Sequence, residues 1–153
     1  MDEGTQPSNG DALALAGRVV LVTGAGRGLG CEHARLLARS GARVVVNDVD
    51  ESADELVAEL VDGGAEAIAV RGDVGSWADA ERMVTTAVEH FDDLHAVINN
   101  AGIIRDNLLV NMTEDDWDDV VRVHLKGHFA ISHFAADFWR TRYNDGRADD
   151  RRI

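Results

Sequence analysis

Short runs of apolar residues alternate along this chain with longer stretches that have helical spacing. Four runs are nearly uniformly apolar, namely Val19–Val22, Val44–Val46, Ala67–Val70 and Ala96–Ile98. Such runs are typical of parallel strands that are covered on both faces. A helical stretch follows each run, and these stretches begin near Leu29, Ser52, Ser76 and Thr113. The pattern predicts an α/β fold of order β-α-β-α-β-α-β-α, which right-handed crossovers wind into a doubly wound parallel sheet.

Polar residues mark the expected helix starts and the domain boundary. Ser52 and Glu55 have the spacing of a capping box. Thr113 is expected to cap the last helix, whose first turn is acidic. Residues 1–16 are mostly small, polar or acidic, and we expect a flexible tail there. Residues 17–153 then form one domain.

The strongest motif joins the first apolar run to the first helical stretch. It reads Thr23-Gly24-Ala25-Gly26-Arg27-Gly28-Leu29-Gly30. Glycines at such a turn allow a sharp bend, close approach of the backbone to a pyrophosphate, and close packing of the helix on the strand. The free N–H groups at the helix start receive the phosphates. We therefore expect a dinucleotide pyrophosphate at Gly24, Gly28 and Leu29.

Two charged residues give opposite indications about the cofactor. Asp48 lies about twenty residues beyond the turn, at the end of the second strand, where a carboxylate accepts both hydroxyls of the adenosine ribose. It would repel the 2′-phosphate of NADP, whereas Arg27 would attract it. We favour NAD over NADP, because Asp48 is the residue expected on the ribose itself.

Composition removes several classes of function. Acidic residues number 28 against 15 basic ones, and a net charge of −13 excludes a nucleic-acid partner. Cys31 is the single cysteine, so no disulfide scaffold is possible within the chain. No apolar run approaches the ~18 residues of a membrane span, and the N-terminus lacks the pattern of a secretory signal. We expect a cytoplasmic protein without a membrane partner.

The Thr23–Gly30 turn, together with Asn99-Asn100-Ala101-Gly102, resembles the short-chain dehydrogenase/reductase family. The resemblance runs from about Gly17 to the C-terminus, and covers the first half to two-thirds of such a domain. It implies a Rossmann-type sheet of strand order 3-2-1-4 and an NAD(P) cofactor. The further cofactor contacts that it implies are Asp73, Val74, Asn100, Ala101 and Gly102.

Two further stretches narrow the resemblance. Residues Gly102–Leu109 and Val123–Gly127 are similar to 3-oxoacyl thioester reductases and to the (3R)-hydroxyacyl-CoA dehydrogenase module of multifunctional β-oxidation enzymes. The resemblance implies interconversion of a carbonyl and a secondary alcohol on an acyl chain held by CoA or by an acyl carrier protein. It also implies a homo-oligomer, since members of the family are usually dimers or tetramers.

The resemblance implies catalysis by Asn, Ser, Tyr and Lys. His124 stands where many members have the Asn, and imidazole can bond a water or a backbone carbonyl, so His124 is our catalytic candidate, with a packing role as the alternative. The Ser and the Tyr-x-x-x-Lys motif are absent from the chain. Tyr143 precedes Arg147 by four residues, which is the spacing of the Tyr and Lys in that motif. We reject Tyr143 as the catalytic tyrosine, because it lies in a polar stretch before any fifth strand and because arginine binds differently from lysine.

These absences leave more than one functional hypothesis. We expect residues 151–153 to start a fifth strand, so that the chain is a truncated NAD-dependent enzyme that is inactive alone. The alternative is a non-catalytic NAD-binding fragment or interaction domain, and an unstable fragment is the third hypothesis. His124 and His128 have a spacing that metals use, but no third ligand accompanies them, so we predict no metal site.

Overall fold

The computed structural model describes residues 14–147. Its strands are β1 (Val19–Val22), β2 (Arg43–Asp48), β3 (Ala67–Arg71) and β4 (Ala96–Ile98). Its α-helices are α1 (Gly28–Arg39), α2 (Ser52–Asp62), α3 (Trp77–Phe91), α4 (Glu114–Val120) and α5 (His128–Asn144). A short 3-10 helix, η2 (Leu109–Asn111), precedes α4, and a π-helix, η3 (Val121–Gly127), joins α4 to α5. All four predicted strands are confirmed.

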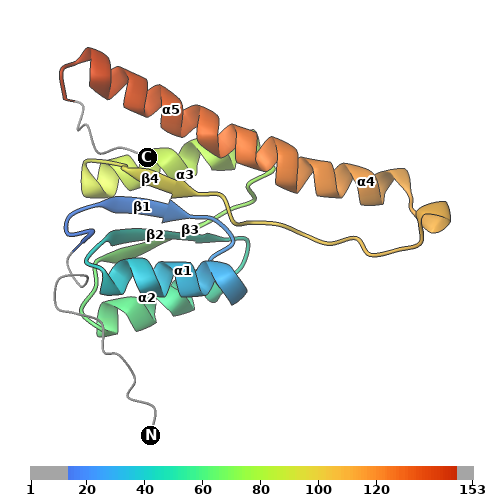
Figure 1. Cartoon of the computed structure of the whole chain (residues 1–153), viewed down its shortest axis with the longest axis horizontal. Coiled ribbons are helices and arrows are strands. Elements are labelled where there is room, and N and C mark those ends of the chain that lie inside the picture. The colour runs from blue at the N-terminus through green and yellow to red at the C-terminus, as the bar shows by residue number, and fades with distance from the viewer. Residues whose placement is uncertain (1–13, 148–153) are drawn as a thin grey trace, which may run out of the picture.

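The strands form one parallel sheet in the order β3-β2-β1-β4. This order and the Rossmann-type α/β class are the predicted ones. Figure 1 shows α1 and α2 on one face of the sheet and α3 with α5 on the other. The carboxyl ends of the strands consequently meet at one edge, where β1 lies between β2 and β4.

Alternate residues of β1 enter two separate cores. Val19 and Leu21 pack with buried side chains of α3 and α5. Val20 and Val22 pack with those of α1 and α2. Because both faces are covered, the strand is uniformly apolar, and each such side chain contributes roughly 1.5–3 kcal/mol on burial.

The helix caps confirm two predictions and correct one. The side chain of Ser76 accepts from Asp79 N at the start of α3, and Thr113 forms a capping box with Asp116 at the start of α4. The predicted capping box at Ser52 is wrong, since Ser52 is already helical. Its N–H and hydroxyl donate instead to Asp50 Oδ1, at 3.0 and 2.5 Å. The carboxylate of Asp50 thus takes the N–H at the start of α2 that a capping box would have left to another side chain.

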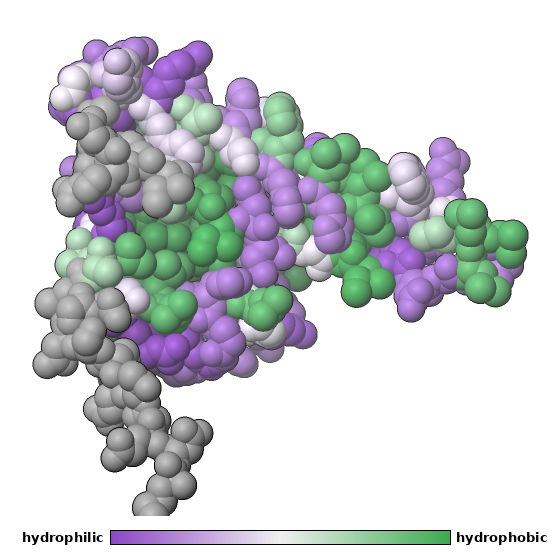
Figure 2. All heavy atoms as spheres, viewed as in Figure 1, coloured by the Kyte–Doolittle hydropathy of each residue, from purple (hydrophilic) through white to green (hydrophobic). Residues whose placement is uncertain are grey.

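Beyond β4 the chain leaves the sheet as an arm that carries η2 at its far end (Figure 1). Figure 2 shows apolar side chains gathered there. Leu109 and Val110 are 85% and 88% exposed, and Leu125 on η3 and Phe129 on α5 are exposed as well. The arm and these two helices therefore present apolar surface to the solvent. Among residues 14–147, no helix combines the length and the apolar character needed to cross a membrane.

Part of the expected tail lies outside the described residues, as does the expected start of a fifth strand at residues 151–153. Leu15, within the predicted tail, packs against the core on the α1 side. Its N–H donates to Ser40 O at 3.0 Å.

A prediction follows from the central position of β1. The side chain of Leu21 is fully buried, so Leu21→Ala should lower the free energy of unfolding by about 2–5 kcal/mol. Leu36 on α1 is 58% exposed, and Leu36→Ala is the matched control with a much smaller loss. Chemical denaturation followed by circular dichroism measures both. Equal losses would contradict the assigned register of the core.

Candidate functional site

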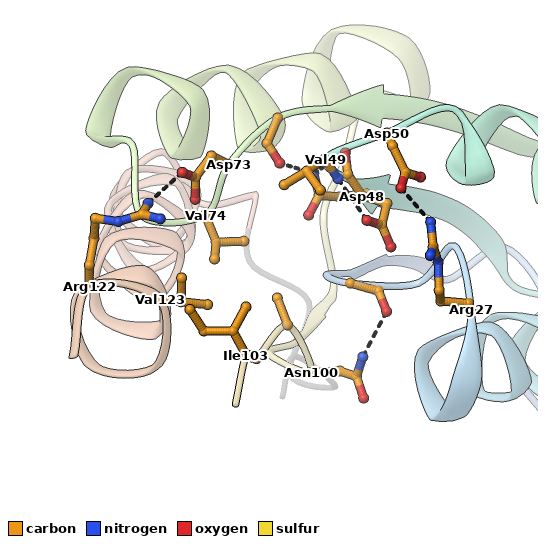
Figure 3. A pocket seen from close by; sticks show the side chains of 15 residues that line it. Arg27, Asp48, Val49, Asp50, Asp73, Val74, Asn100, Ile103, Arg122 and Val123 are labelled. Carbon is orange, nitrogen blue, oxygen red and sulfur yellow. Dashed lines mark hydrogen bonds and ion pairs between the residues drawn. The ribbon is translucent and has the colours of Figure 1, made fainter. Parts of the chain in front are cut away.

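A pocket of about 470 Å³ lies at the carboxyl ends of the strands (Figure 3). The pocket brings together residues from loops that are far apart in sequence. Eight of the eleven residues predicted from the sequence line it, namely Gly24, Arg27, Asp48, Asp73, Val74, Asn100, Ala101 and Gly102. Such a position, beside the point where the strand order reverses, is where open α/β sheets bind ligands.

A buried threonine joins the glycine turn to the end of β4. Thr23 Oγ1 accepts hydrogen bonds from the N–H groups of Asn100 and Ala101 at 3.0 and 3.1 Å. The Asn100 side-chain amide donates in return to the backbone oxygens of Thr23 and Gly24, at 3.0 and 2.9 Å. These bonds satisfy backbone groups where the sheet ladder ends. They hold the turn at a fixed place beside Asn100.

Gly24 has no room for a side chain and adopts a left-handed conformation, with φ of +60°. A Cβ on Gly24 would lie 2.7 Å from Ala101 Cα. Any larger residue would push β1 and the segment after β4 apart, so the pocket wall depends on this glycine.

Helix α1 begins directly after Arg27, and no side chain caps its start. Gly28 has φ of +60° and open space beside its Cα, while Leu29 is 74% exposed. Neither Gly28 nor Leu29 is among the residues that line the pocket. The N–H groups of the first helical turn are thus open to an external acceptor.

Asp48 ends β2 and is half-buried in the pocket. Its Oδ2 accepts from Gly26 N at 2.9 Å, and its Oδ1 accepts from Val49 N at 2.8 Å. These two bonds fix the carboxylate against the glycine turn. Each oxygen keeps a second lone pair for a donor in the pocket.

Arg27 and Asp50 form an ion pair at the rim of the pocket. Figure 3 shows the Arg27 side chain reaching from the α1 side toward Asp50. Hydrogen bonds from the Ser52 hydroxyl and N–H, followed by the Arg27 charge, lower the pKa of Asp50 below its ordinary value. The sequence analysis weighed Arg27 as a cation that would attract the 2′-phosphate of NADP, and in the structure its charge is paired with Asp50.

Asn47 is a buried polar residue of the site that our sequence reasoning missed. Its side-chain amide donates to Val70 O and Gly72 O at 2.9 and 3.0 Å. The backbone carbonyl of Asn47 accepts from Ala25 N at 2.8 Å. The signal was a single amide directly after the apolar run Val44–Val46.

The opposite wall of the pocket contains Asp73 and the buried Val74. Arg122, on the π-helix η3, forms an ion pair with Asp73 across this wall (Figure 3). Sequence analysis missed Arg122, because no local pattern separates it from a solvent-exposed helical arginine. The pair ties the loop after β3 to the helix that carries His124.

His124 lies outside the pocket lining, behind Gly102 and Ile103. Its Nε2 is 2.8 Å from Ile103 O and 3.0 Å from Ile103 N. The nitrogen donates to the carbonyl when protonated and accepts from the N–H in the other tautomer. His128 Nε2 is 3.2 Å from Ala101 O, so both imidazoles contact the segment after β4.

Other reactive residues lie away from the pocket. Cys31 is buried, and burial raises the pKa of its thiol, an effect that the Arg35 charge opposes. Tyr143 is 73% exposed near the end of α5. Within residues 14–147 no group of three or more metal-binding side chains is found.

Comparison with known proteins identifies the family. The model of the short chain dehydrogenase family matches residues 18–147. This chain belongs to the short-chain dehydrogenase family. Its members are dehydrogenases and reductases that use NAD(H) or NADP(H).

The chain is similar to several characterised members of the short-chain dehydrogenase family. It is 44% identical to hydroxyacyl-CoA dehydrogenase ChsB1 of Mycobacterium tuberculosis, over 91% of this chain and 45% of that protein. It is 42% identical to a 3-oxoacyl-[acyl-carrier-protein] reductase of Synechocystis, over 76% and 48%. A crystal structure of a short chain dehydrogenase from Mycobacterium avium superposes with a TM-score of 0.87 at 44% identity, covering 89% of this chain and 50% of the other. The chain thus spans about half the length of these relatives.

A prediction tests the bonds of Thr23. Thr23→Val keeps the shape but removes the acceptor of two N–H groups, so it should lower the free energy of unfolding by about 1–3 kcal/mol. Thr23→Ser keeps the hydroxyl and should retain most of the stability. Thermal unfolding followed by circular dichroism compares them. A Ser variant as unstable as the Val variant would contradict the role of the hydroxyl.

Proposed function

We propose that this chain provides the NAD-binding part of an oxidoreductase that interconverts a carbonyl and a secondary alcohol. The proposal rests chiefly on the pocket that the glycine turn and the Asp48 carboxylate line, beside the uncapped start of α1. Family membership supports the reaction class. NAD, when bound, carries the hydride, and the residues described here bind and orient it.

The glycine turn suits a pyrophosphate for electrostatic and steric reasons. The N–H groups of Gly28 and Leu29 open α1, whose start has no side-chain cap. A helix start with free donors attracts negative phosphates. The space beside Gly28 lets the backbone approach them closely. Gly24 contributes by holding the turn next to Ala101.

The remaining pocket residues suit the two ends of the cofactor. Asp48 has free lone pairs for the ribose hydroxyls, and a 2′-phosphate there would meet its negative charge, which favours NAD over NADP. Asp73 and the buried Val74 form a wall for the adenine. Asn100, Ala101 and Gly102 lie on the side expected to face the second ribose and the nicotinamide.

His124 is the proposed member of the proton relay in this chain. In the protonated tautomer its Nε2 donates to Ile103 O at 2.8 Å, and its ring lies against Gly102. This arrangement supports the proposed bond from the imidazole to a backbone carbonyl. Nδ1 is then the ring nitrogen that would contact a water of the proposed proton relay.

The relatives suggest the class of substrate. Two of them are named hydroxyacyl-CoA dehydrogenase and 3-oxoacyl-[acyl-carrier-protein] reductase. We therefore propose a 3-oxoacyl or 3-hydroxyacyl thioester as the small-molecule substrate. We also propose that the protein forms a homo-oligomer, for which the exposed Leu125 and Phe129 offer apolar contact surface. We propose the cytoplasm as its location.

A second candidate is a non-catalytic NAD-binding domain. It is favoured by the position of His124, the catalytic candidate of the sequence analysis, outside the residues that line the pocket. It shares the pocket and the cofactor with the first candidate. Only turnover separates the two.

Binding of the cofactor is tested with the chain itself. Isothermal titration with NAD should show saturable binding, and Asp48→Ala should weaken NAD more than NADP, because it removes both the ribose acceptor and the repulsive charge. Asp62→Ala, at the far end of α2, is a control outside the pocket. Absence of NAD binding at millimolar concentration would contradict the proposal, and equal losses for both cofactors would refute the role of Asp48.

Catalysis is tested with a form extended toward the length of the relatives. It should oxidise NADH in the presence of 3-oxoacyl thioesters, which absorbance at the nicotinamide band measures. His124→Ala should lower kcat with little change in the Kd of NAD, while His124→Asn should restore part of kcat. An inactive extended form that still binds NAD would favour the non-catalytic candidate.

A further inference from the structure

The ion pair between Arg27 and Asp50 lies at the rim of the pocket, beside the glycine turn. Both residues line the pocket, and both side chains are open to solvent, at 70% and 46% exposure. Exposed ion pairs of this kind contribute little to folding stability. The pair therefore matters more for the distribution of charge at the rim of the pocket than for the stability of the fold.

Asp50 is held by bonds that do not involve Arg27. Its Oδ1 accepts from the N–H and the hydroxyl of Ser52, at the first residue of α2. Its Oδ2 is left to face the guanidinium of Arg27. The short, anchored carboxylate thus determines where the long arginine side chain lies.

The local charge balance is negative because of this residue. Asp48 and Asp50 contribute two carboxylates beside one guanidinium. Figure 3 shows Arg27 directed to Asp50, with Asp48 on the pocket side of the pair. A 2′-phosphate at the ribose would have to displace Asp50 from Arg27 while lying close to both carboxylates.

We propose that Asp50 is a specificity-determining residue, which excludes NADP by occupying Arg27 and by adding a second negative charge beside Asp48. This inference rests on the proposed function, because it assumes that the adenosine ribose lies at Asp48. Asp48 alone would repel a 2′-phosphate but would leave Arg27 able to attract it, whereas Asp50 also pairs with Arg27. Removing the charge of Asp50 releases Arg27 to bind a phosphate.

The variant Asp50→Asn tests this directly. Asparagine keeps an oxygen for the N–H of Ser52, so the start of α2 is preserved, while the charge is lost. Titration calorimetry at one low ionic strength gives the Kd of NAD and of NADP. Asp50→Asn should tighten NADP about fivefold and change NAD by less than about twofold. Adding Arg27→Gln should abolish the gain for NADP.

A matched variant separates the local effect from net charge. Asp54 lies in the first turn of α2, pairs with Arg71 at 2.5 Å, and does not line the pocket. Asp54→Asn removes the same charge and should leave the Kd of NADP unchanged. An equal gain in this variant, or a gain that survives Arg27→Gln, would overturn the inference.

The outcomes also distinguish this inference from the proposed function. If the unaltered chain and Asp50→Asn both bind NAD, and NADP binding is the same in the two, the inference alone is wrong. If the unaltered chain binds no NAD, the proposed function is wrong and the inference fails with it. Matching thermal unfolding curves show that the variants are folded.

Discussion

Satisfaction of backbone polar groups at the carboxyl edge of the sheet is the constraint on which the pocket depends. Where the strand ladders end, buried N–H and C=O groups need partners from elsewhere. The hydroxyl of Thr23 and the side-chain amides of Asn47 and Asn100 supply them. These three side chains connect the ends of all four strands. Their bonds hold the glycine turn and the pocket walls in register.

The electrostatics of the site are local and do not follow the net charge. A chain of net charge −13 repels anions at long range, yet salt screens such repulsion beyond about a Debye length. At short range the open donors of α1 favour an anion, while Asp48 and Asp50 make the neighbouring rim negative. The charge of Asp73 is compensated by Arg122. The open start of α1 and the acidic rim thus differ in electrostatic character, as the proposed binding of phosphate at one and of ribose at the other requires.

The sequence predicted the sheet well because its strands are buried on both faces and each is followed by a helix with clear end signals. About half of the pocket lining was also predicted, Gly24, Arg27 and Asp48 from the glycine turn and the end of β2, and the rest through the family resemblance. Pairings across the chain were not predictable. The bond of Asp50 to Ser52 displaced the expected cap, and the pairs Arg27–Asp50 and Arg122–Asp73 join residues whose proximity only the packed fold creates.

The bonds between Thr23 and Asn100 join residues 77 positions apart in the chain. Closing so long a loop is entropically costly, and contacts of this kind slow folding relative to local ones. During synthesis, β1, β2 and β3 emerge and can pair before Asn100 leaves the ribosome. The β1–β4 ladder is therefore the one that depends on the longest separation in sequence, and it is also the one that completes the pocket.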